Sequence, residues 1–366
     1  MAAGAERALT IDGVRVDDDS QCYVIAEVGH NHQGSVEQAR ALLAEAKACG
    51  ANAVKLQKRD NRRLYTRAFY DRPYEHENSF GATYGEHREA LELGRSEYEE
   101  LIAYAREIGI TLFATAFDEP SVEFLAELDM PAYKVASGDL TNVALIRRIA
   151  QTGRPVIVST GAATLDDVRR AYEAAREASD QVALLQCTAG YPAAWDELDL
   201  RVISTYRDEF PDAVVGLSSH DNGIAMATAA YVLGARIVEK HFTLNRALKG
   251  TDHVFSLEPA GLRKLVRDLR RARLAMGDGT KRTYASEAEP ARKMRKALVA
   301  ARDLEAGHVL AAEDLIARSP GDGLPPYMAD ALVGRALLAP LARDEAVAED
   351  MLAPAPDLAG RVADGG

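Results

Sequence analysis

Short apolar runs recur along most of the chain, and each run is apolar on both of its faces. Strands of a parallel sheet that helices cover on both sides have this pattern, whereas a strand with one face in water alternates apolar and polar residues. The eight runs lie at residues 23–28, 53–57, 111–116, 132–136, 155–160, 182–187, 214–218 and 236–240. We therefore expect eight buried parallel strands.

Helical periodicity separates most of these runs. Between residues 35 and 50, apolar side chains recur at helical spacing (SVEQARALLAEAKACG). Ser35 with Gln38 predicts a capping box at the start of this helix, and Gly50 predicts its end. A second helix is expected to begin at Thr164, with Asp167 in the same relation to it.

Eight strands that alternate with helices over residues 23–276 match the count and length of a (β/α)8 (TIM) barrel, an α/β fold of about 250 residues. A doubly wound open sheet is the alternative, and it commonly carries a glycine-rich phosphate turn after its first strand. Here the first strand is followed by GHNHQG, and the chain contains no GxGxxG or Walker motif. The barrel is therefore the favoured fold.

The alternation defines a barrel domain at residues 1–276 and is interrupted twice. Residues 58–95 form a long polar and aromatic insertion that is expected to overhang the C-terminal rim of the barrel, where barrel enzymes bind ligands. Residues 277–293 are predicted to be a linker. Residues 294–353, with short β-like runs and turns, are predicted to be a small, mostly β domain whose core is marginal by itself. Residues 354–366 are predicted to be a flexible tail.

Charge and cysteine content exclude several classes of protein. With 44 Lys and Arg against 56 Asp and Glu, the 366-residue chain has a formal net charge of −12, which argues against nucleic acid and anionic membranes as partners. No apolar run approaches the roughly 18–20 residues that span a bilayer, and the first ten residues lack the features of a signal peptide. Three widely separated cysteines are not a disulfide framework. We therefore expect a soluble, cytoplasmic protein.

Polar side chains stand at the predicted carboxyl ends of the strands, where a packed barrel interior favours Val, Ile and Leu. They are Glu27, Lys55, Gln57, Thr115, Lys134, Ser137, Ser159, Thr160, Ser218, Ser219, His220, Glu239, Lys240 and His241. Because these strand ends meet at one rim of a barrel, we expect one site with complementary charges. Any one of them by itself is equally well explained as a polar residue of a wet rim.

Two lysines at this rim form a candidate clamp for a dianion. Lys55 and Lys134 would act together with the hydroxyl groups of Ser137, Ser159 and Thr160. Such a clamp suits a ligand that carries a phosphate and a carboxylate.

Two histidines at the ends of adjacent strands, His220 and His241, are candidate ligands of a divalent metal with open coordination positions. Two histidines that line the rim without a metal are the alternative interpretation. Glu27 and Asp252 are candidate acid/base carboxylates. The histidines of GHNHQG are weaker metal candidates, because their spacing is not diagnostic.

Nine motifs in order along the chain resemble those of the sialic acid synthase family. They are IAEVGHNHQG, AVKLQ, FATAFD, AYKVASGDLTN, PVIVSTGAA, LLQCTAGYP, GLSSHDNG, EKHFT and TDHVFS. The likeness covers nearly the whole chain. Residues 294–353, with SPGDG, resemble the antifreeze-like (SAF) domain at the C-terminus of that family.

The resemblance implies a reaction, its substrates and a metal. Members of the family condense phosphoenolpyruvate with the open-chain aldehyde of a hexosamine such as N-acetylmannosamine, and release a nine-carbon ulosonic (sialic-type) acid and phosphate. The resemblance also implies a divalent metal ion at His220 and His241, typically Mn²⁺, with Mg²⁺ or Co²⁺ as alternatives. It further implies a homodimer in which each SAF domain crosses to the barrel of the other subunit.

Site residues of the family carry over to matching positions of this sequence. The positions that hold phosphoenolpyruvate are Lys55, Thr115, Lys134, Ser137 and Ser159. Glu27 and Asp252 match positions near the attacking water and the acceptor. The acceptor contacts of the family match Gln57 and Tyr191.

Three departures from the family pattern concern the acceptor. The Asn of the family's T-N-x-Y-P segment is Ala189 here, and the SAF-domain arginine directly before PG is Ser319, with Arg318 one residue earlier as its candidate substitute. The insertion at 58–95 is longer than the family pattern has it, and the residues at its start are more basic. The acceptor therefore stays open between N-acetylmannosamine, a deoxy-diacetamido hexose, a hexose without an N-acyl group and a phosphorylated sugar.

Two other classes of function also stay open. A (β/α)8 aldolase would use Lys134 or Lys240 to form a Schiff base, which borohydride would trap. A carbohydrate-binding protein that has lost its activity would keep the barrel without holding a metal.

Overall fold

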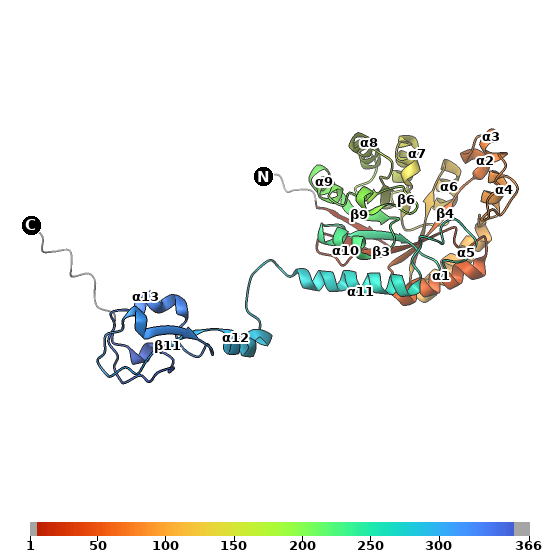
Figure 1. Ribbon diagram of the computed structural model, residues 1–366. Helices are drawn as coiled ribbons and strands as arrows, with labels where there is room; N and C mark the ends of the chain where they lie inside the picture. Colours follow the sequence, from red (N-terminus) through yellow and green to blue (C-terminus); the bar gives the residue numbers. More distant parts are fainter. Residues whose placement is uncertain (1–5, 355–366) are drawn as a thin grey trace, which may run out of the picture. The chain divides into compact units, whose positions relative to one another are not determined.

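The computed structural model describes residues 6–354. The chain forms two compact units, of which the first ends at Gly277 and the second begins at Asp278. Figure 1 shows the ribbon of both units. The predicted tail, residues 354–366, lies outside the described residues except for Pro354.

The first unit is a closed barrel of eight parallel strands, as the sequence predicts (Figure 1). Each strand pairs with its neighbours in chain order, and β10 closes the barrel on β3. The strands are β3 (Tyr23–Gly29), β4 (Ala53–Lys58), β5 (Thr111–Ala116), β6 (Tyr133–Val135), β7 (Val156–Ser159), β8 (Val182–Cys187), β9 (Val214–Ser219) and β10 (Ile237–His241).

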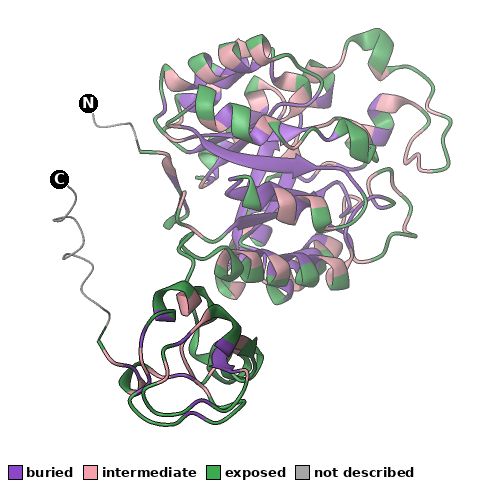
Figure 2. Cartoon of the chain, turned by 60° about the vertical axis from the view of Figure 1, so that its left-hand side comes forward, coloured by how far each residue is buried: buried purple, intermediate pink, exposed green. Residues whose placement is uncertain are grey.

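Helices surround this barrel and explain why its strands are apolar on both faces. Figure 2 shows buried strands enclosed by helices that expose their outer faces. Inward side chains fill the barrel while outward ones pack under the helices, so neither face of a strand meets water. The helices that follow the strands are α1 (Val36–Cys49), α5 (Arg95–Ile108), α6 (Glu119–Glu127), α7 (Val143–Ala150), α8 (Leu165–Arg176), α9 (Val202–Glu209), α10 (Ala225–Val232) and α11 (Pro259–Met276).

Helix ends follow the predicted capping residues with one exception. Thr164 and Asp167 form the reciprocal capping box of α8, and Gly50 ends α1 in the left-handed region (φ +88°). Ser35 accepts a hydrogen bond from the Gln38 amide, but the Gln38 side chain donates to the Asn31 carbonyl instead of returning to Ser35. The capping box predicted for α1 is therefore wrong in its second half, because the Ser35 amide donates to the His32 carbonyl at 2.9 Å instead of to the Gln38 side chain.

A β-hairpin before the barrel, β1 (Ala8–Ile11) and β2 (Val14–Asp17), was missed in the sequence. Its signal is an Asp12–Gly13 turn between two alternating runs. Thr10 and Asp12 bond to Gln181 and Thr111, which lie at the amino ends of β8 and β5. The hairpin therefore covers the end of the barrel opposite to the strand carboxyl ends.

The insertion between β4 and α5 contains three short helices, α2 (Asn61–Leu64), α3 (Arg67–Tyr70) and α4 (Tyr84–Glu89). They lie together beside the barrel in Figure 1. Aromatic rings hold them together: the Tyr84 ring lies 4.7 Å from that of Phe69 and 5.4 Å from that of Tyr74. The insertion is thus a packed cluster that carries side chains of its own to the rim.

The second unit has its own apolar core and a two-stranded antiparallel sheet, β11 (Ala297–Ala300) with β12 (Leu315–Arg318). It also contains α12 (Ala288–Met294) and α13 (Ala329–Leu332). The segment 277–293, predicted as a linker, therefore includes most of a helix. The buried core residues are Leu298, Ala300, Leu304, Leu310, Leu315, Leu332, Leu337, Leu341, Val347 and Leu352.

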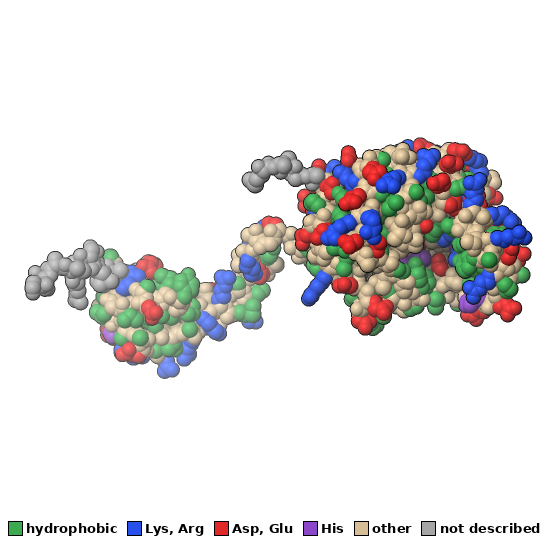
Figure 3. All heavy atoms as spheres, turned by 90° about the horizontal axis from the view of Figure 1, so that it is seen from above, with side chains coloured by type: hydrophobic (Ala, Val, Ile, Leu, Met, Phe, Trp, Pro, Cys, Tyr) green, Lys and Arg blue, Asp and Glu red, His purple; other side chains and the backbone are tan. Residues whose placement is uncertain are grey.

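Acidic and basic side chains are intermixed over the surface that Figure 3 shows. Among residues 6–354, no helix is both long enough and apolar enough to span a bilayer.

A buried carboxylate, Asp314, organises the second unit and is expected to be needed for its stability. Its carboxylate pairs with Arg302 and His308, each at 2.7 Å, and accepts a hydrogen bond from the Ala311 amide at 2.9 Å. We expect Asp314→Asn to lower the free energy of unfolding of this unit by about 1–3 kcal/mol, since donors lose their acceptor. Hydrogen exchange of residues 295–353 in the full chain measures this.

The matched control is Asp330→Asn, an exposed carboxylate of the same unit, which should change nothing. Burial works to raise the pKa of Asp314, but hydrogen bonds from His308 and Ala311 lower it on balance. The stabilisation should therefore be complete at neutral pH and fall as the pH drops below about 4. Equal protection in both variants would contradict the prediction.

Candidate active site

A cavity of about 700 Å³ opens at the carboxyl ends of the barrel strands. This is a volume typical of small-molecule sites. The structure brings most of the site residues predicted for the barrel into its lining: Glu27, Lys55, Gln57, Thr115, Lys134, Ser137, Ser159, Tyr191, His220, His241 and Asp252. Thr160, predicted for the clamp, does not line the cavity, because its hydroxyl group donates to the Leu185 carbonyl at 2.9 Å, and Ser219, which donates to Asp221, does not line it either. Ala189, one of the departures from the family pattern, lies in the same lining.

The first predicted lysine is already paired with a carboxylate. Lys55 Nζ on β4 lies 2.6 Å from Glu27 Oε2 on the neighbouring β3 and donates to Thr115 Oγ1 at 2.6 Å. Gln57 Nε2 donates to the other oxygen of Glu27 at 2.7 Å. A ligand anion at Lys55 must therefore share the ammonium group with Glu27.

Burial determines the proton affinity of Glu27. It raises the pKa of Glu27 to about 7, although the Lys55 ammonium acts to lower it. A carboxyl group with this pKa takes up or gives up a proton readily at neutral pH, which suits an acid/base role. When Glu27 is protonated, the charge of Lys55 is free for an anionic ligand.

The second predicted lysine lies on β6. Lys134 Nζ donates to Ser159 Oγ at 2.5 Å and to the Val135 carbonyl at 2.9 Å, and lies 4.0 Å from Glu239 Oε1. Burial lowers the pKa of Lys134. Its neighbour on the clamp, Ser137 Oγ, accepts a hydrogen bond from the Gly161 amide at 2.9 Å.

Lys240, the other candidate for a Schiff base, does not line the cavity. Its Nζ donates to the carboxylate and the carbonyl of Asp221, at 2.9 and 2.6 Å. Burial lowers the pKa of Lys240, although the ion pair with Asp221 acts to raise it. Of the two candidates for a Schiff base, Lys134 is therefore the one that lines the cavity.

The two predicted histidines lie side by side, with ring centroids 5.3 Å apart. Nδ1–H of His220 donates to the Thr188 carbonyl at 2.9 Å, which leaves its Nε2 lone pair free. Burial lowers the pKa of His220 to about 4 and also lowers that of His241. Both rings are thus neutral at pH 7, the form that binds metals.

The residues present fit a divalent metal ion with an incomplete protein ligand set. His241 Nδ1 is buried without a hydrogen-bond partner, and so is Glu239 Oε2 nearby. Among residues 6–354, no group of three or more His, Cys, Asp or Glu side chains is arranged to hold a metal. An ion at the two histidines would therefore need water or substrate to complete its coordination.

Aromatic rings and a carboxylate complete the histidine side of the cavity. The Tyr191 ring lies 4.1 Å from His220, and the Phe255 ring 4.8 Å from His241. Asp252 Oδ2 lies 3.7 Å from His241 Nδ1. Burial works to raise the pKa of Asp252, but His241 and His30 lower it on balance, so this side chain is a carboxylate.

Arg318, the predicted SAF-domain residue, lies in the second unit. It ends β12, and its guanidinium is 2.9 Å from Asp344 Oδ1. Ser319, the next residue, accepts a hydrogen bond from Lys296 Nζ at 2.7 Å.

Several residues of the lining were not predicted from the sequence. The insertion contributes Arg59, Tyr74, Tyr84 and Arg88, and the loops after β5 and β10 contribute Phe117 and Phe255. The signals for this group were the basic and aromatic residues of the insertion, and the positions of Phe117 and Phe255 in the motifs FATAFD and TDHVFS. Arg88 stands in a helix that carries no recognisable motif, so its place in the site depends on the folding of the insertion.

The sequence pattern of the NeuB family matches residues 42–281, and that of the SAF domain matches residues 295–353. The NeuB match covers seven of the eight barrel strands, β4 to β10, and the SAF match lies within the second unit of the structure.

Curated relatives cover the two parts together. The N-acetylneuraminate-9-phosphate synthase of Mus musculus is 39% identical over 90% of this chain and 92% of its own. The N,N'-diacetyllegionaminic acid synthase of Legionella pneumophila is 35% identical over 89% of this chain and 94% of its own. A crystal structure of N-acetylneuraminic acid (sialic acid) synthetase from Leptospira borgpetersenii, in complex with citrate, aligns with a TM-score of 0.69 at 30% identity, and covers 79% of this chain and 96% of that one. The chain therefore belongs to the NeuB family.

Proposed function

We propose that this protein is a phosphoenolpyruvate-dependent synthase. It condenses phosphoenolpyruvate with the open-chain aldehyde of N-acetylmannosamine or a related hexosamine, forms a nine-carbon ulosonic acid and releases phosphate. The observation that carries this proposal is that two buried lysines, Lys55 and Lys134, share one cavity with the histidine pair. This combination suits a dianionic donor beside a polarised aldehyde.

The donor site of the proposal consists of the lysines and hydroxyl groups on β4 to β7. Lys55 and Lys134 would bind the phosphate and carboxylate of phosphoenolpyruvate, with Thr115, Ser137 and Ser159 as hydrogen-bond partners. These charges and dipoles are in place before substrate arrives, so stabilising charge in the transition state requires little rearrangement.

In the proposed reaction, C3 of phosphoenolpyruvate attacks the aldehyde carbon, and the aldehyde oxygen becomes a hydroxyl group. Positive charge develops at C2. Water adds to this carbon, and Glu27 accepts one proton from the water. The hydroxyl group that water leaves on C2 then loses its proton as the C2–O bond to the phosphate breaks, so that C2 becomes a ketone carbonyl and phosphate leaves. The proton that Glu27 accepts balances the one that the aldehyde oxygen takes up. Asp252, Gln57 and Tyr191 are placed to orient the acceptor.

A divalent metal ion held by His220 and His241 would polarise the aldehyde oxygen. We propose Mn²⁺, with Mg²⁺ and Co²⁺ as alternatives.

The acceptor is tested with a panel of aldoses. Each is incubated with phosphoenolpyruvate, and phosphate release and product mass are measured. We expect equimolar phosphate and an ulosonic acid three carbons longer than the acceptor. Substrate-dependent inactivation by borohydride would instead indicate a Schiff-base aldolase that uses Lys134, and binding without turnover of any aldose would indicate a carbohydrate-binding protein.

We further propose that the enzyme is a cytoplasmic homodimer whose SAF domains serve the barrels of the opposite subunits. Mixing full-length His241→Ala with a chain that lacks residues 285–366 tests this. Each variant should be nearly inactive alone. At equal mixing about a quarter of wild-type activity should return, since half of the dimers are mixed and each has one complete site. No recovery after confirmed subunit exchange would contradict the exchange of domains.

A further inference from the structure

Two arginines of the insertion line the outer part of the cavity, and the proposed reaction of phosphoenolpyruvate leaves both unused. Arg59 follows β4 directly and is 7% exposed. Arg88 lies in α4 and is half-buried. Both belong to the same cavity lining as Lys55 and Lys134.

One imidazole joins the two guanidinium groups. Arg59 Nη1 lies 2.9 Å from His30 Nε2, and Arg88 Nη1 lies 3.2 Å from His30 Nδ1. A neutral imidazole has one accepting nitrogen, so His30 satisfies one of these arginines and presents an N–H group to the other. One guanidinium N–H at this point therefore lacks an acceptor.

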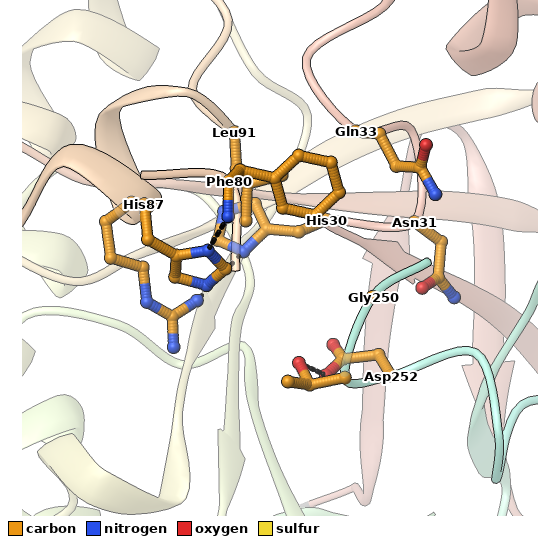
Figure 4. Close-up of a pocket in the computed structure, with 10 residues that line it drawn as sticks. His30, Asn31, Gln33, Phe80, His87, Leu91, Gly250 and Asp252 are labelled. Atoms are coloured by element: carbon orange, nitrogen blue, oxygen red, sulfur yellow. Dashed lines mark hydrogen bonds between the residues drawn. The ribbon is translucent and has the colours of Figure 1, made fainter. Parts of the chain in front are cut away.

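Neither arginine is neutralised by a carboxylate within 4.0 Å in the part of the chain that the structure describes. Glu92, an acidic residue near this group, is paired with Lys58 at 3.0 Å and lies 3.7 Å from His30 Nε2. Asp252 lies across a small cavity from His30 (Figure 4), and its ion-pair partner is His241 at 3.7 Å. The lysines of the barrel rim, in contrast, each have a carboxylate nearby.

The remaining contacts fix the planes of the guanidinium groups without reducing their charge. Arg59 lies over the Phe117 ring at 3.7 Å and donates to Gln57 Oε1 at 2.6 Å. Arg88 donates twice to Tyr84 Oη, at 3.0 and 2.9 Å. Two oriented and unpaired guanidinium groups match the oxygen atoms of a phosphate, because each presents a fork of N–H donors.

Gln57, an acceptor contact, links the lysine end of the cavity to the end that carries these arginines. Gln57 bonds through its amide nitrogen to Glu27, the partner of Lys55, and through its oxygen to Arg59. We propose that Arg59 and Arg88 bind a phosphate monoester at the far end of the acceptor, so that the acceptor is a hexosamine 6-phosphate. This inference rests on the proposed function, and it selects the phosphorylated sugar among the acceptors that the sequence leaves open.

Binding of unreactive acceptor analogues tests the site without catalysis. N-acetylmannosaminitol and its 6-phosphate have no aldehyde, and calorimetry on the full-length enzyme compares their affinities. We expect the 6-phosphate to bind at least about tenfold more tightly to the wild type. Arg88→Gln should abolish most of this difference, and Arg88→Lys, which keeps the charge but not the fork, should retain part of it.

Arg62→Gln is the matched control, since Arg62 is a 77% exposed arginine of the same insertion that does not line this cavity. The affinities of this variant for the two acceptor analogues should equal those of the wild type. Equal affinity of the wild type for both analogues would overturn the proposal, as would a phosphate preference that survives in both Arg59→Gln and Arg88→Gln.

Turnover measurements distinguish the proposed phosphate subsite from the proposed synthase reaction. With N-acetylmannosamine 6-phosphate, Arg88→Gln should lower kcat/KM about 10- to 100-fold, and should change the KM for phosphoenolpyruvate by much less. A KM for phosphoenolpyruvate that rises equally would assign the arginines to the donor and overturn the proposal. A phosphate preference in binding without any turnover would leave the subsite standing and reject the synthase reaction.

Discussion

His241→Ala is expected to abolish turnover, with kcat at least about a thousandfold below that of the wild type. The expected cause is loss of the divalent metal, because one histidine cannot retain it and the aldehyde oxygen loses several kcal/mol of charge stabilisation. Two measurements check this: metal content per chain after reconstitution with Mn²⁺, and phosphate release with saturating substrates. The wild type should hold about one ion per chain and the variant none.

His253→Gln is the matched control for this variant. His253 is a buried histidine of the loop that follows β10, but its ring bonds to Thr243 at 2.7 Å and does not line the cavity. This control should keep its metal and most of its turnover. Full activity of a chelator-treated wild type that contains no divalent ion would contradict the metal requirement.

Lys55→Ala is expected to raise the KM for phosphoenolpyruvate about 10- to 100-fold, while the KM for the sugar changes by less than about threefold. A charge-assisted contact to a dianion is worth about 1.5–3 kcal/mol, and the variant loses it on one substrate only. The variant also leaves Glu27 without its ammonium partner at 2.6 Å. We therefore expect kcat to fall as well, because an unpaired buried carboxyl group favours its protonated form.

Lys58→Ala is the matched control. It distinguishes loss of a charge inside the cavity from loss of a lysine elsewhere on β4. Lys58 lies on the same strand and is paired with Glu92, outside the cavity lining. It should leave both KM values close to those of the wild type. Equal increases for both substrates in Lys55→Ala would show that Lys55 does not belong to the donor site.

The barrel and the location of the site were predictable because both follow from local patterns. Strands buried on two faces have continuous apolar runs, and the carboxyl ends of parallel strands in a closed barrel meet at one rim. Lys55, Lys134, His220 and His241 therefore had to lie near one another once the eight strands were recognised. The hairpin at Ala8–Asp17 was equally local, and its Asp12–Gly13 turn was readable.

Partners across the barrel and in the insertion could not be predicted in this way. The pairing of Lys55 with Glu27 depends on the register between β3 and β4, and the raised pKa of Glu27 depends on how much water the closed barrel excludes. The Arg59–His30–Arg88 group joins three segments that are separated in sequence and meet only after the insertion has packed. The sequence thus determines which strand end carries each side chain, while burial and contacts between distant segments determine the charge state of each group and the partner it meets, because both depend on the three-dimensional surroundings.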